Sequence, residues 1–470
     1  MKDKSLISKY YKKLSGRDPI EIVPLPRSGS DRKYYRVVEP LKNVIAAINT
    51  NTEENDTFVG FTQHFRKQNL PVPEIIEYYR DANLYFQSDL GDTNLFTWLE
   101  RKRHLSGFGD AIIRMYKKVL EELVNFQLKA IRKLDLNLCY PHQSFDAQSM
   151  TWDMNYFKYM FVKLAAVPFN EKRLERDFDN LRKLLLKAGN EFFLYRDFQS
   201  ANIMIVDGEP WFIDYQGGRS GAPQYDVASL LYDSKAHIPQ QAREILLEYY
   251  IEKFTDACDY DELLFRELYP AFVLVRIMQA LGAYGYRGLF EQKPGFVQSI
   301  IPAVRDISYI LDTGIPGSEF PELKKLVDAI QDTRKFEALK QPETLRIKIS
   351  SFSYMNGLPV DAVHGGGYIY DCRSLVNPGK KSEFRYLTGL DNAVAQFMET
   401  DPGLKGFIDD AYSMVERSVK SYKKKNYTSL AVSFGCTGGR HRSVYCAERF
   451  AEKLRQIEGI DIEIIHRDID

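Results

Sequence analysis

LYRDFQSANIMIVDGEPWFIDYQGG, residues 194–218, alternates short apolar runs with turn residues and carries three polar side chains at fixed spacing. Asp197 is followed by Asn202 five residues later, and Asp214 comes twelve residues after that. The runs FFLYRDF, NIMIV and PWFIDY predict short strands joined by turns. Asn202 and Asp214 then fall at strand or loop ends, where side chains can converge on a cleft.

Phosphoryl transfer needs these residue types. A carboxylate orients the attacking hydroxyl and accepts its proton, and oxygen ligands hold magnesium against nucleotide phosphates. Asp197 suits the first role, and Asn202 and Asp214 suit the second. The alternative is a turn rich in Asp and Asn without chemistry, because one D-x4-N match is common. The longer match, which includes QYDVASL at 224–230, favours a phosphotransfer site.

The surrounding segments predict a small sheet followed by helices. The first ~95 residues hold EIVPLP, YYRVV and NVIAAI, which predict an antiparallel sheet with a turn at Ser28-Gly29-Ser30. TFVGFTQHFRKQN has helical spacing and ends before Pro71, and NLYFQSDLG is typical of a strand ending in a loop. Residues 96–187 and 222–330 are mostly helical in pattern.

Residues 20–330 resemble the aminoglycoside phosphotransferase/choline kinase superfamily, whose members are relatives of protein kinases. The resemblance is carried by four segments: SGSDRKYYRV (29–37 covering its core), SDLGDTNL at 88–95, YRDFQSANIM at 195–204, and IDYQGG with PQYDVASLLYD within 213–233. The nearest likeness within the superfamily is to AmgK-type kinases. Those enzymes phosphorylate N-acetylmuramate and N-acetylglucosamine at the anomeric hydroxyl during peptidoglycan recycling.

This resemblance implies an α+β bilobal protein-kinase-like domain, with an N-lobe at 1–95 and a C-lobe at 96–332. It implies ATP and Mg2+ as cofactors and Asp197 as the residue that positions the sugar hydroxyl. Tyr195 and Asp226 are expected to support the catalytic loop. The expected nucleotide-binding residues are Ser28, Gly29, Ser30, Arg36, Asp89 and Leu90.

The sequence departs from this pattern in three places. Tyr195 replaces the usual histidine, which we interpret as a change in loop support. The strand NVIAAINTN lacks the phosphate-binding lysine, so Lys33, Arg36, Lys42 or backbone N–H groups with metal are the alternatives. The glycine-rich loop contains only one glycine, so a plain hairpin turn is equally compatible with it. The candidates to face the acceptor are Gln216, Gly217 and Arg219.

A polar stretch, RKFEALKQPET, predicts a linker at 333–344 before a separate α/β domain at 345–470. LRIKISSFS, GGYIYDC, SLAVSFGC and IEIIHRD are predicted strands, and they alternate with predicted helices. The alternation favours a mixed or largely parallel sheet.

Within this domain GCTGGRHRS, residues 435–443, follows an apolar strand and precedes a helix. Glycines let backbone N–H groups approach an anion, and the helix N-terminus and arginines add positive charge. The pattern therefore predicts a phosphate-binding loop. The same residues also fit C-x5-R-S, the loop of cysteine phosphatases, in which a thiolate attacks phosphorus.

Residues ~345–468 resemble the RapZ C-terminal domain more closely than a phosphatase. Besides GCTGG-x-HRS, the resemblance is carried by LPVDA at 358–362, YDCR at 370–373, NP at 377–378, LTGLD at 387–391 and HRD at 466–468. It implies glucosamine-6-phosphate as ligand and, in some members, regulatory RNA, although the usual P-loop domain is absent here. The expected anion-pocket residues are Arg373, Arg385, Cys436, Thr437, Gly438, Gly439, His441, Arg442 and Ser443.

The overall composition limits the partners. Lysine plus arginine and aspartate plus glutamate both number 64, which argues against a nucleic-acid binder that relies on bulk charge. Five widely spaced cysteines, no apolar leader and no membrane-length apolar run predict a cytoplasmic protein with reduced thiols. The RapZ resemblance suggests self-association. A non-catalytic sensor that binds a sugar phosphate and RNA or protein is the main alternative to a kinase.

Overall fold

The computed structural model describes residues 2–26, 32–40, 42–291, 293–331, 345–359, 367–424, 427 and 429–469. The chain divides into two compact units: Met1–Ala283 with Pro302–Gln331, and Tyr284–Ile301 with Asp332–Asp470. The expected turn at Ser28-Gly29-Ser30, the linker at 333–344 and part of LPVDA lie outside the described residues. The lobe boundaries at 95 and 332 stay predictions.

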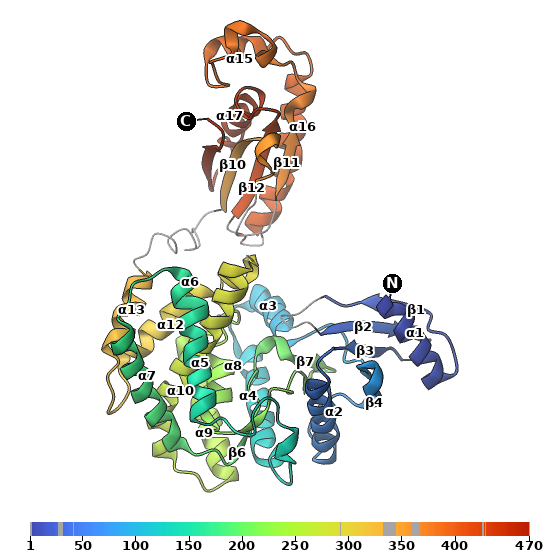
Figure 1. Cartoon of the computed structure of the whole chain (residues 1–470), viewed down its shortest axis with the longest axis vertical. Coiled ribbons are helices and arrows are strands. Elements are labelled where there is room, and N and C mark those ends of the chain that lie inside the picture. The colour runs from blue at the N-terminus through green and yellow to red at the C-terminus, as the bar shows by residue number, and fades with distance from the viewer. Residues whose placement is uncertain are drawn as a thin grey trace. The chain divides into compact units, whose positions relative to one another are not determined.

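The first unit begins with an antiparallel five-stranded sheet of order β1-β2-β3-β5-β4 (Figure 1). Its strands are β1 (Glu21–Pro24), β2 (Lys33–Val38), β3 (Val44–Ile48), β4 (Ile75–Tyr79) and β5 (Leu84–Ser88). This confirms the predicted sheet and adds β4 to it.

Two helices cover the two faces of this sheet. Neighbouring side chains of a strand point to opposite faces. Phe86 accordingly lies in a core cluster with Ile7 and Tyr11 of α1 (Lys2–Ser15), whereas Tyr85 stacks on Phe58 of α2 (Thr52–Lys67) at 5.2 Å. The sequence interpretation missed α1, and α2 matches the predicted helix.

The rest of the first unit is mainly helical and holds two short two-stranded sheets. The sheets pair β6 (Phe192–Leu194) with β9 (Arg219–Gly221) and β7 (Ile203–Val206) with β8 (Glu209–Phe212). Among the helices, α4 packs against α9, and α7 packs against α5 and α13. The helices are α3 (Leu95–Ser106), α4 (Asp110–Asn125), α5 (Ala147–Phe157), α6 (Lys163–Ala165), α7 (Glu171–Leu185), α8 (Gln224–Leu231), α9 (Gln240–Ala257), α10 (Glu262–Tyr284), α11 (Pro294–Val297), α12 (Ile300–Thr313) and α13 (Pro321–Gln331). By the division above, α11 belongs to the second unit, and α10 and α12 reach its boundary.

The second unit is built on a four-stranded sheet of order β11-β12-β10-β13, in which every pairing is parallel. Its strands are β10 (Leu345–Ser353), β11 (Tyr368–Asp371), β12 (Ser429–Cys436) and β13 (Ile460–His466). The helices are α15 (Asn392–Met398), α16 (Leu404–Lys424) and α17 (Arg442–Leu454), and both α16 and α17 pack against β10. The predicted largely parallel α/β domain is confirmed.

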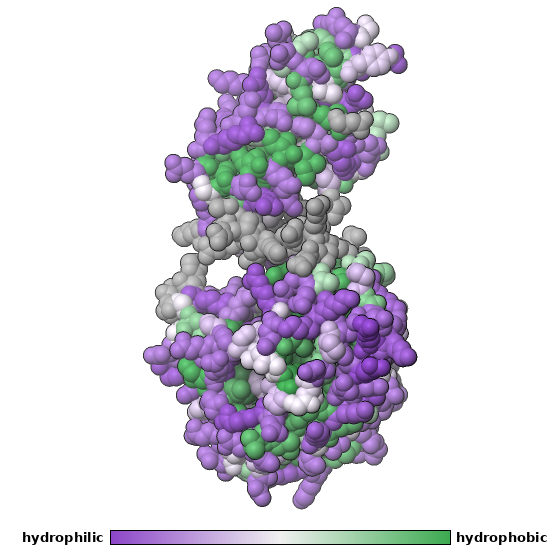
Figure 2. Space-filling view, turned by 90° about the vertical axis from the view of Figure 1, so that its left-hand side faces the viewer, coloured by the Kyte–Doolittle hydropathy of each residue, from purple (hydrophilic) through white to green (hydrophobic). Residues whose placement is uncertain are grey.

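Hydrophilic side chains cover most of the face shown in Figure 2, with apolar groups gathered in smaller areas on each unit. Among the described residues no helix is long and apolar enough to cross a membrane. All five cysteines are free thiols.

Candidate active site

The 195–202 loop, expected to be the catalytic loop, is held by two aspartates, one in α8 and one just after it. Asp226 in α8 accepts hydrogen bonds from the backbone N–H groups of Tyr195 at 2.7 Å and Arg196 at 2.9 Å. Asp233, seven residues later, accepts from the N–H of Ser200 at 3.2 Å and from its hydroxyl at 2.5 Å. Asp226 lies within α8 (Gln224–Leu231) and Asp233 lies just beyond its end, so the two aspartates brace both ends of the loop. Sequence reasoning missed Asp233, although the spacing was readable.

The loop is further fixed by buried polar contacts. The Tyr195 hydroxyl donates to the carbonyl of Ile213 at 2.6 Å, which joins the loop to the segment that carries Asp214. Burial raises the pKa of Asp226 to about 7, and the two backbone donors oppose that rise. Arg196 has φ +84°, a left-handed conformation that is strained for a side chain other than glycine.

Asp197 and Asn202 lie together at this loop. The Asn202 side chain donates through Nδ2 to the carbonyl of Asp197 at 2.9 Å. That bond directs the amide so that Oδ1 is left as an acceptor. The Asp197 carboxylate is half-buried, and burial raises its pKa while the charges of Arg276 and Arg196 oppose the rise.

Asp214 follows β8, has φ +70° and lines a cavity beside the loop. Its Oδ1 accepts from Gln216 Nε2 at 2.8 Å. The next residue, Tyr215, stacks on Phe58 of α2 at 5.0 Å and shares a 2.5 Å hydrogen bond with Thr62. The position of Asp214 is therefore tied to α2.

A cavity of about 530 Å³ lies beside these residues. Asn202 and Asp214 provide its polar side, and Ser88 to Asp92 of the segment after β5 form another wall. The apolar lining is made by Leu25, Tyr34, Ile45, Phe58, Met204 and Ile213. An apolar slot that ends in oxygen ligands has the form expected of a nucleotide pocket. The predicted residues Asp89 and Leu90 line it.

Arg32 brings a buried cation close to Asp214, one of the residues that line this cavity. Its side chain is 1% exposed, and its Nη2 lies 2.9 Å from Glu54 Oε1 in α2. Its Nη1 lies 4.0 Å from Asp214 Oδ1 and 3.3 Å from the Tyr34 hydroxyl. Arg32 thus forms an ion pair with the helix that packs on the sheet, next to a candidate metal ligand. Sequence reasoning overlooked it because Arg32 precedes β2 instead of lying on β3.

Two of the cations considered as replacements for the missing lysine have other partners. Lys33 pairs with Asp3 at 2.8 Å on the outer side of the sheet. Arg36 pairs with Asp89 at 2.5 Å and with Asp92 at 2.8 Å. Arg36 therefore fastens the 88–92 segment to β2, and its predicted contact with nucleotide stays a prediction. Lys42 is exposed.

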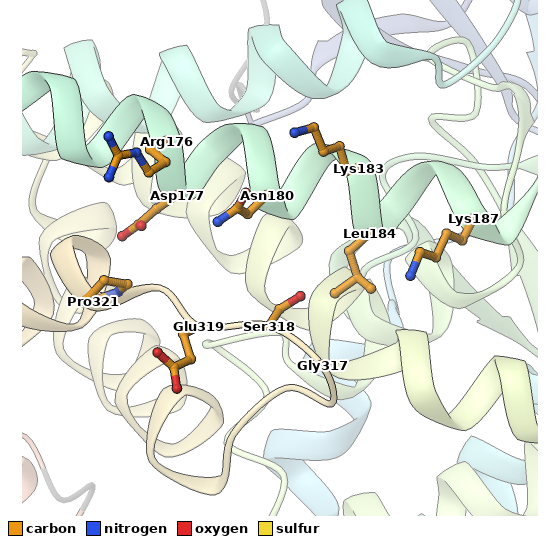
Figure 3. A pocket seen from close by; sticks show the side chains of 10 residues that line it. All are labelled: Arg176, Asp177, Asn180, Lys183, Leu184, Lys187, Gly317, Ser318, Glu319 and Pro321. Atoms are coloured by element: carbon orange, nitrogen blue, oxygen red, sulfur yellow. The ribbon is translucent and has the colours of Figure 1, made fainter.

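A second cavity, of about 440 Å³, lies between α7 and the segment before α13 (Figure 3). Arg176, Asp177 and Lys183 line one wall, and Ser318 and Glu319 line the other. The Asp177 carboxylate has a structural role, because it accepts hydrogen bonds from the backbone N–H groups of Glu322 at 2.8 Å and Leu323 at 2.9 Å. Asn202 and Asp214 line the first cavity, and Asp197 lies at the same loop as Asn202, so we take this cavity as the candidate active site.

In the second unit the 435–443 loop joins β12 to α17. Cys436 is 3% exposed, and its Sγ accepts from the N–H of Gly439 at 3.2 Å and lies 3.2 Å from the Ser443 hydroxyl. Gly439 has φ +70°, and a methyl group there would lie 2.9 Å from the backbone nitrogen of Ser353. Thr437 and Gly438 are exposed, so the outer part of the loop presents its backbone to solvent.

The loop is secured by long-range contacts. Arg442 is buried, and its Nη1 donates to the carbonyls of Arg373 at 3.0 Å and Leu375 at 3.4 Å. His441 Nε2 contacts the carbonyl of Phe384 at 3.0 Å, immediately before the exposed Arg385. The structure thus brings the predicted pocket residues to one place, but it directs the Arg442 guanidinium inward.

Comparison with known proteins agrees with both halves of this description. Residues 21–263 match the profile of the phosphotransferase enzyme family, and residues 345–470 match that of the RapZ C-terminal domain. The first match covers more than half of the chain, which therefore belongs to the phosphotransferase enzyme family, with a RapZ-like domain after it. This confirms the resemblances inferred from the motifs.

Curated relatives include a nucleotide-binding protein of Acidothermus cellulolyticus, 36% identical over 173 residues, or 35% of this chain and 52% of that protein. Another, from Thermobifida fusca, is 42% identical over 127 residues, or 27% and 41%. The chain spans about half the length of the curated relatives it matches.

Similar solved structures include an ethanolamine kinase of Plasmodium vivax, with 12% identity and a TM-score of 0.48 over 64% of this chain and 87% of that one. A choline kinase of Streptococcus pneumoniae matches with 12% identity and a TM-score of 0.45 over 66% and 100%.

Proposed function

We propose that this protein transfers the γ-phosphoryl group of ATP to a hydroxyl of a cell-wall amino sugar. The observation that carries the proposal is the convergence of Asp197, Asn202 and Asp214 at one loop and its adjoining cavity. The acceptor we propose is N-acetylmuramate or N-acetylglucosamine at the anomeric hydroxyl, by resemblance to the AmgK-type kinases.

Asp197, Asn202 and Asp214 have different roles in the proposed reaction. Asp197 accepts a hydrogen bond from the sugar hydroxyl and takes its proton as the oxygen attacks phosphorus. The Asp226 and Asp233 contacts keep that carboxylate in position before substrate arrives. Asn202 Oδ1 and the Asp214 carboxylate are the hard oxygen ligands that Mg2+ prefers, and the remaining ligands would come from phosphates and water. When bound, the metal neutralises charge on the phosphates.

Arg32 supplies the positive charge that the missing strand lysine supplies in protein kinases. Glu54 holds its guanidinium at 2.9 Å, and Asp214 lies 4.0 Å away, where nucleotide phosphates would meet the metal. A guanidinium with several fixed donors can bind phosphate oxygens while it stays paired with a carboxylate. We therefore assign to Arg32 the phosphate contact for which the sequence offered Lys33, Arg36, Lys42 or backbone N–H groups with metal.

For the second unit we propose that the 435–443 loop binds glucosamine-6-phosphate and regulates the kinase. The exposed backbone of Thr437 and Gly438 and the exposed guanidinium of Arg385 support anion binding, whereas the Arg373 guanidinium already pairs with Asp371 at 2.7 Å. Equal kinase kinetics with and without the sugar phosphate would show that the second unit does not regulate the kinase. The balanced charge gives no support for RNA as a partner, and a homo-oligomer remains a proposal from the resemblance alone.

One observation favours a second candidate for this loop, a cysteine phosphatase. Cys436 Sγ accepts an N–H at 3.2 Å and lies 3.2 Å from a hydroxyl, contacts that stabilise a thiolate. Arg442 argues against it, because a phosphatase needs that guanidinium on the phosphate oxygens. Loss of a phosphatase activity in Cys436→Ser would establish this candidate.

The test of the main proposal is phosphate transfer from ATP to N-acetylmuramate, N-acetylglucosamine, glucosamine and an aminoglycoside. We expect transfer to an N-acetyl sugar that Asp197→Asn abolishes, with product NMR showing phosphate on the anomeric oxygen. Transfer to the aminoglycoside alone would reassign the acceptor. Absence of transfer to every acceptor would favour a non-catalytic sensor that binds a sugar phosphate.

A further inference from the structure

Arg219 is a buried arginine that lacks an acidic partner. It lies in β9 and is 5% exposed. One edge of its guanidinium, Nε and Nη2, donates to the carbonyl of Gly217, each at 3.1 Å. In the part of the chain that the structure describes, Nη1 has no hydrogen-bond acceptor, Nη2 has none besides Gly217, and no carboxylate lies within 4.0 Å of the guanidinium. A desolvated guanidinium is costly without an anion.

The neighbouring Arg196, unlike Arg219, has an acidic hydrogen-bond partner. Its Nη1 lies 2.7 Å from Asp153 Oδ2 and 2.8 Å from the Tyr225 hydroxyl, and a second bond to Asp153 makes the pair bidentate. Arg196 therefore uses the nearby carboxylate. Burial, together with the charge of Arg196, lowers the pKa of Arg219 to about 10, which leaves it protonated at neutral pH.

Arg219 is also linked to the proposed catalytic carboxylate through Gly217. Gly217, whose carbonyl it holds, lies beside the catalytic carboxylate: a methyl group on Gly217 would be 3.8 Å from Asp197 Oδ2. The hydroxyl that receives phosphate must contact Asp197, so the rest of the acceptor lies around this turn. The nucleotide cavity is lined by other residues, including Asn202 and Asp214.

We propose that Arg219 binds a carboxylate carried by the acceptor, so that the enzyme selects an acidic sugar over its neutral counterpart. The inference rests on the proposed function and deepens it. The free Nη1–Nη2 edge presents two parallel donors, the geometry that a carboxylate accepts in a bidentate pair. The bond to Gly217 fixes the guanidinium before the ligand arrives.

N-acetylmuramate and N-acetylglucosamine form a matched pair of probes, because they differ by an ether-linked lactyl group that bears a carboxylate. The experiment measures kcat/KM for both sugars with the full-length wild type, Arg219→Gln and Arg219→Lys. Gln can still donate to the Gly217 carbonyl but has no charge. Lys keeps the charge but lacks the pair of parallel N–H donors. Arg176→Gln, an exposed arginine of the second cavity, is the control for a generic loss of positive charge (Figure 3).

We expect the wild type to prefer N-acetylmuramate and Arg219→Gln to lower the ratio of the two kcat/KM values by about tenfold to a hundredfold. Arg219→Lys should fall between them, and Arg176→Gln should match the wild type. The inference is overturned if Arg219→Gln slows both sugars equally, which would mark Arg219 as a support of the Gly217 turn. A wild type that prefers the neutral sugar would overturn it as well.

A binding measurement separates this inference from the proposed function. If neither sugar is phosphorylated, the proposed function fails, and calorimetry of both sugars with the AMP-PNP-bound protein tests Arg219 by itself. Tighter binding of N-acetylmuramate that Arg219→Gln removes supports the anion site, and equal or absent binding rejects it. Should Arg219→Gln unfold, as judged by thermal melting, the Arg219→Lys ratio decides.

Discussion

The 195–214 segment of the first unit and the 435–443 loop of the second both place polar residues after a buried strand, but their charged side chains face opposite ways. In the first, Asp226 and Asp233 lie beneath the loop and hold its backbone. The Asp197 carboxylate is therefore not needed to hold the loop and is available for the substrate role that we propose. In the second, Arg442 itself turns inward and holds the carbonyls of Arg373 and Leu375. A charged residue in a motif can thus bind the ligand or stabilise the loop, depending on whether another residue already holds the loop backbone.

The largest expected effect tests whether Asp197 serves the substrate. Asp197→Asn should lower kcat about 10²- to 10⁴-fold, because the amide cannot accept the hydroxyl proton. Steady-state phosphate transfer measures the loss, and circular dichroism checks the fold. Asp207→Asn, in the exposed turn between β7 and β8 with φ +51°, is the matched control, since asparagine tolerates that conformation. Equal rates for the two variants would contradict the assignment.

Arg32 gives the next effect, because it pairs with Glu54 of α2 and lies 4.0 Å from Asp214, which lines the cavity. Arg32→Met should raise the KM for ATP about tenfold to a hundredfold, through loss of a charge-assisted contact with phosphate. The adjacent Lys33→Met removes a cation that pairs with Asp3 on the outer side, so its KM should stay near that of the wild type. Glu54→Gln should have a smaller effect than Arg32→Met. An unchanged KM in Arg32→Met would return the phosphate contact to backbone N–H groups.

In the second unit the comparison predicts that two nearby arginines behave differently. Arg442→Met should destabilise the domain by about 1–3 kcal/mol, because two inward-facing carbonyls lose their donor. Hydrogen exchange of the full chain, read over residues 367–398, measures that loss. Arg440→Met, at an exposed position, should leave exchange unchanged and weaken glucosamine-6-phosphate binding in calorimetry. The reverse pattern would make Arg442 the anion ligand after all.

The smallest expected effect concerns pH. The charge of Arg276 lowers the pKa of Asp197, against the rise that burial causes. Arg276→Gln should therefore raise the pKa of Asp197, so that the ionised base is lost at a higher pH as the solution is acidified. The acid limb of the kcat/KM profile should move to higher pH, with little change at its plateau. A limb that stays in place would show that another group controls it.

Sequence patterns correctly predicted features that depend on residues close together in the chain. The alternating runs of 192–212 predicted β6, β7 and β8, and the Asp197, Asn202 and Asp214 spacing predicted residues that the fold brings together. Helix α1 was not predicted, although Ile7, Tyr11 and Leu14 have helical spacing. A short charged segment is rarely stable as a helix through its own propensity alone. Its stability comes from packing against the sheet.

Other features depend on residues far apart in the chain and had no local signal. Arg32 reaches Asp214 only because the sheet and α2 are packed together, across 182 positions of sequence (214 minus 32). The inward turn of Arg442 depends on carbonyls 67 and 69 positions away. Motif spacing identifies candidate residues, but tertiary partners determine the direction of each side chain.

The contacts of α2 carry a consequence for exchange kinetics. One helix holds Glu54, which fixes Arg32, and Phe58 and Thr62, which fix Tyr215 beside Asp214. A displacement of α2 would therefore withdraw the proposed phosphate-binding cation and the proposed metal ligand together. By thermodynamic linkage, a nucleotide that engages both groups must in turn stabilise the docked helix. The amides of Thr52–Lys67 then report on nucleotide occupancy, even though Phe58 is the residue of α2 that lines the cavity.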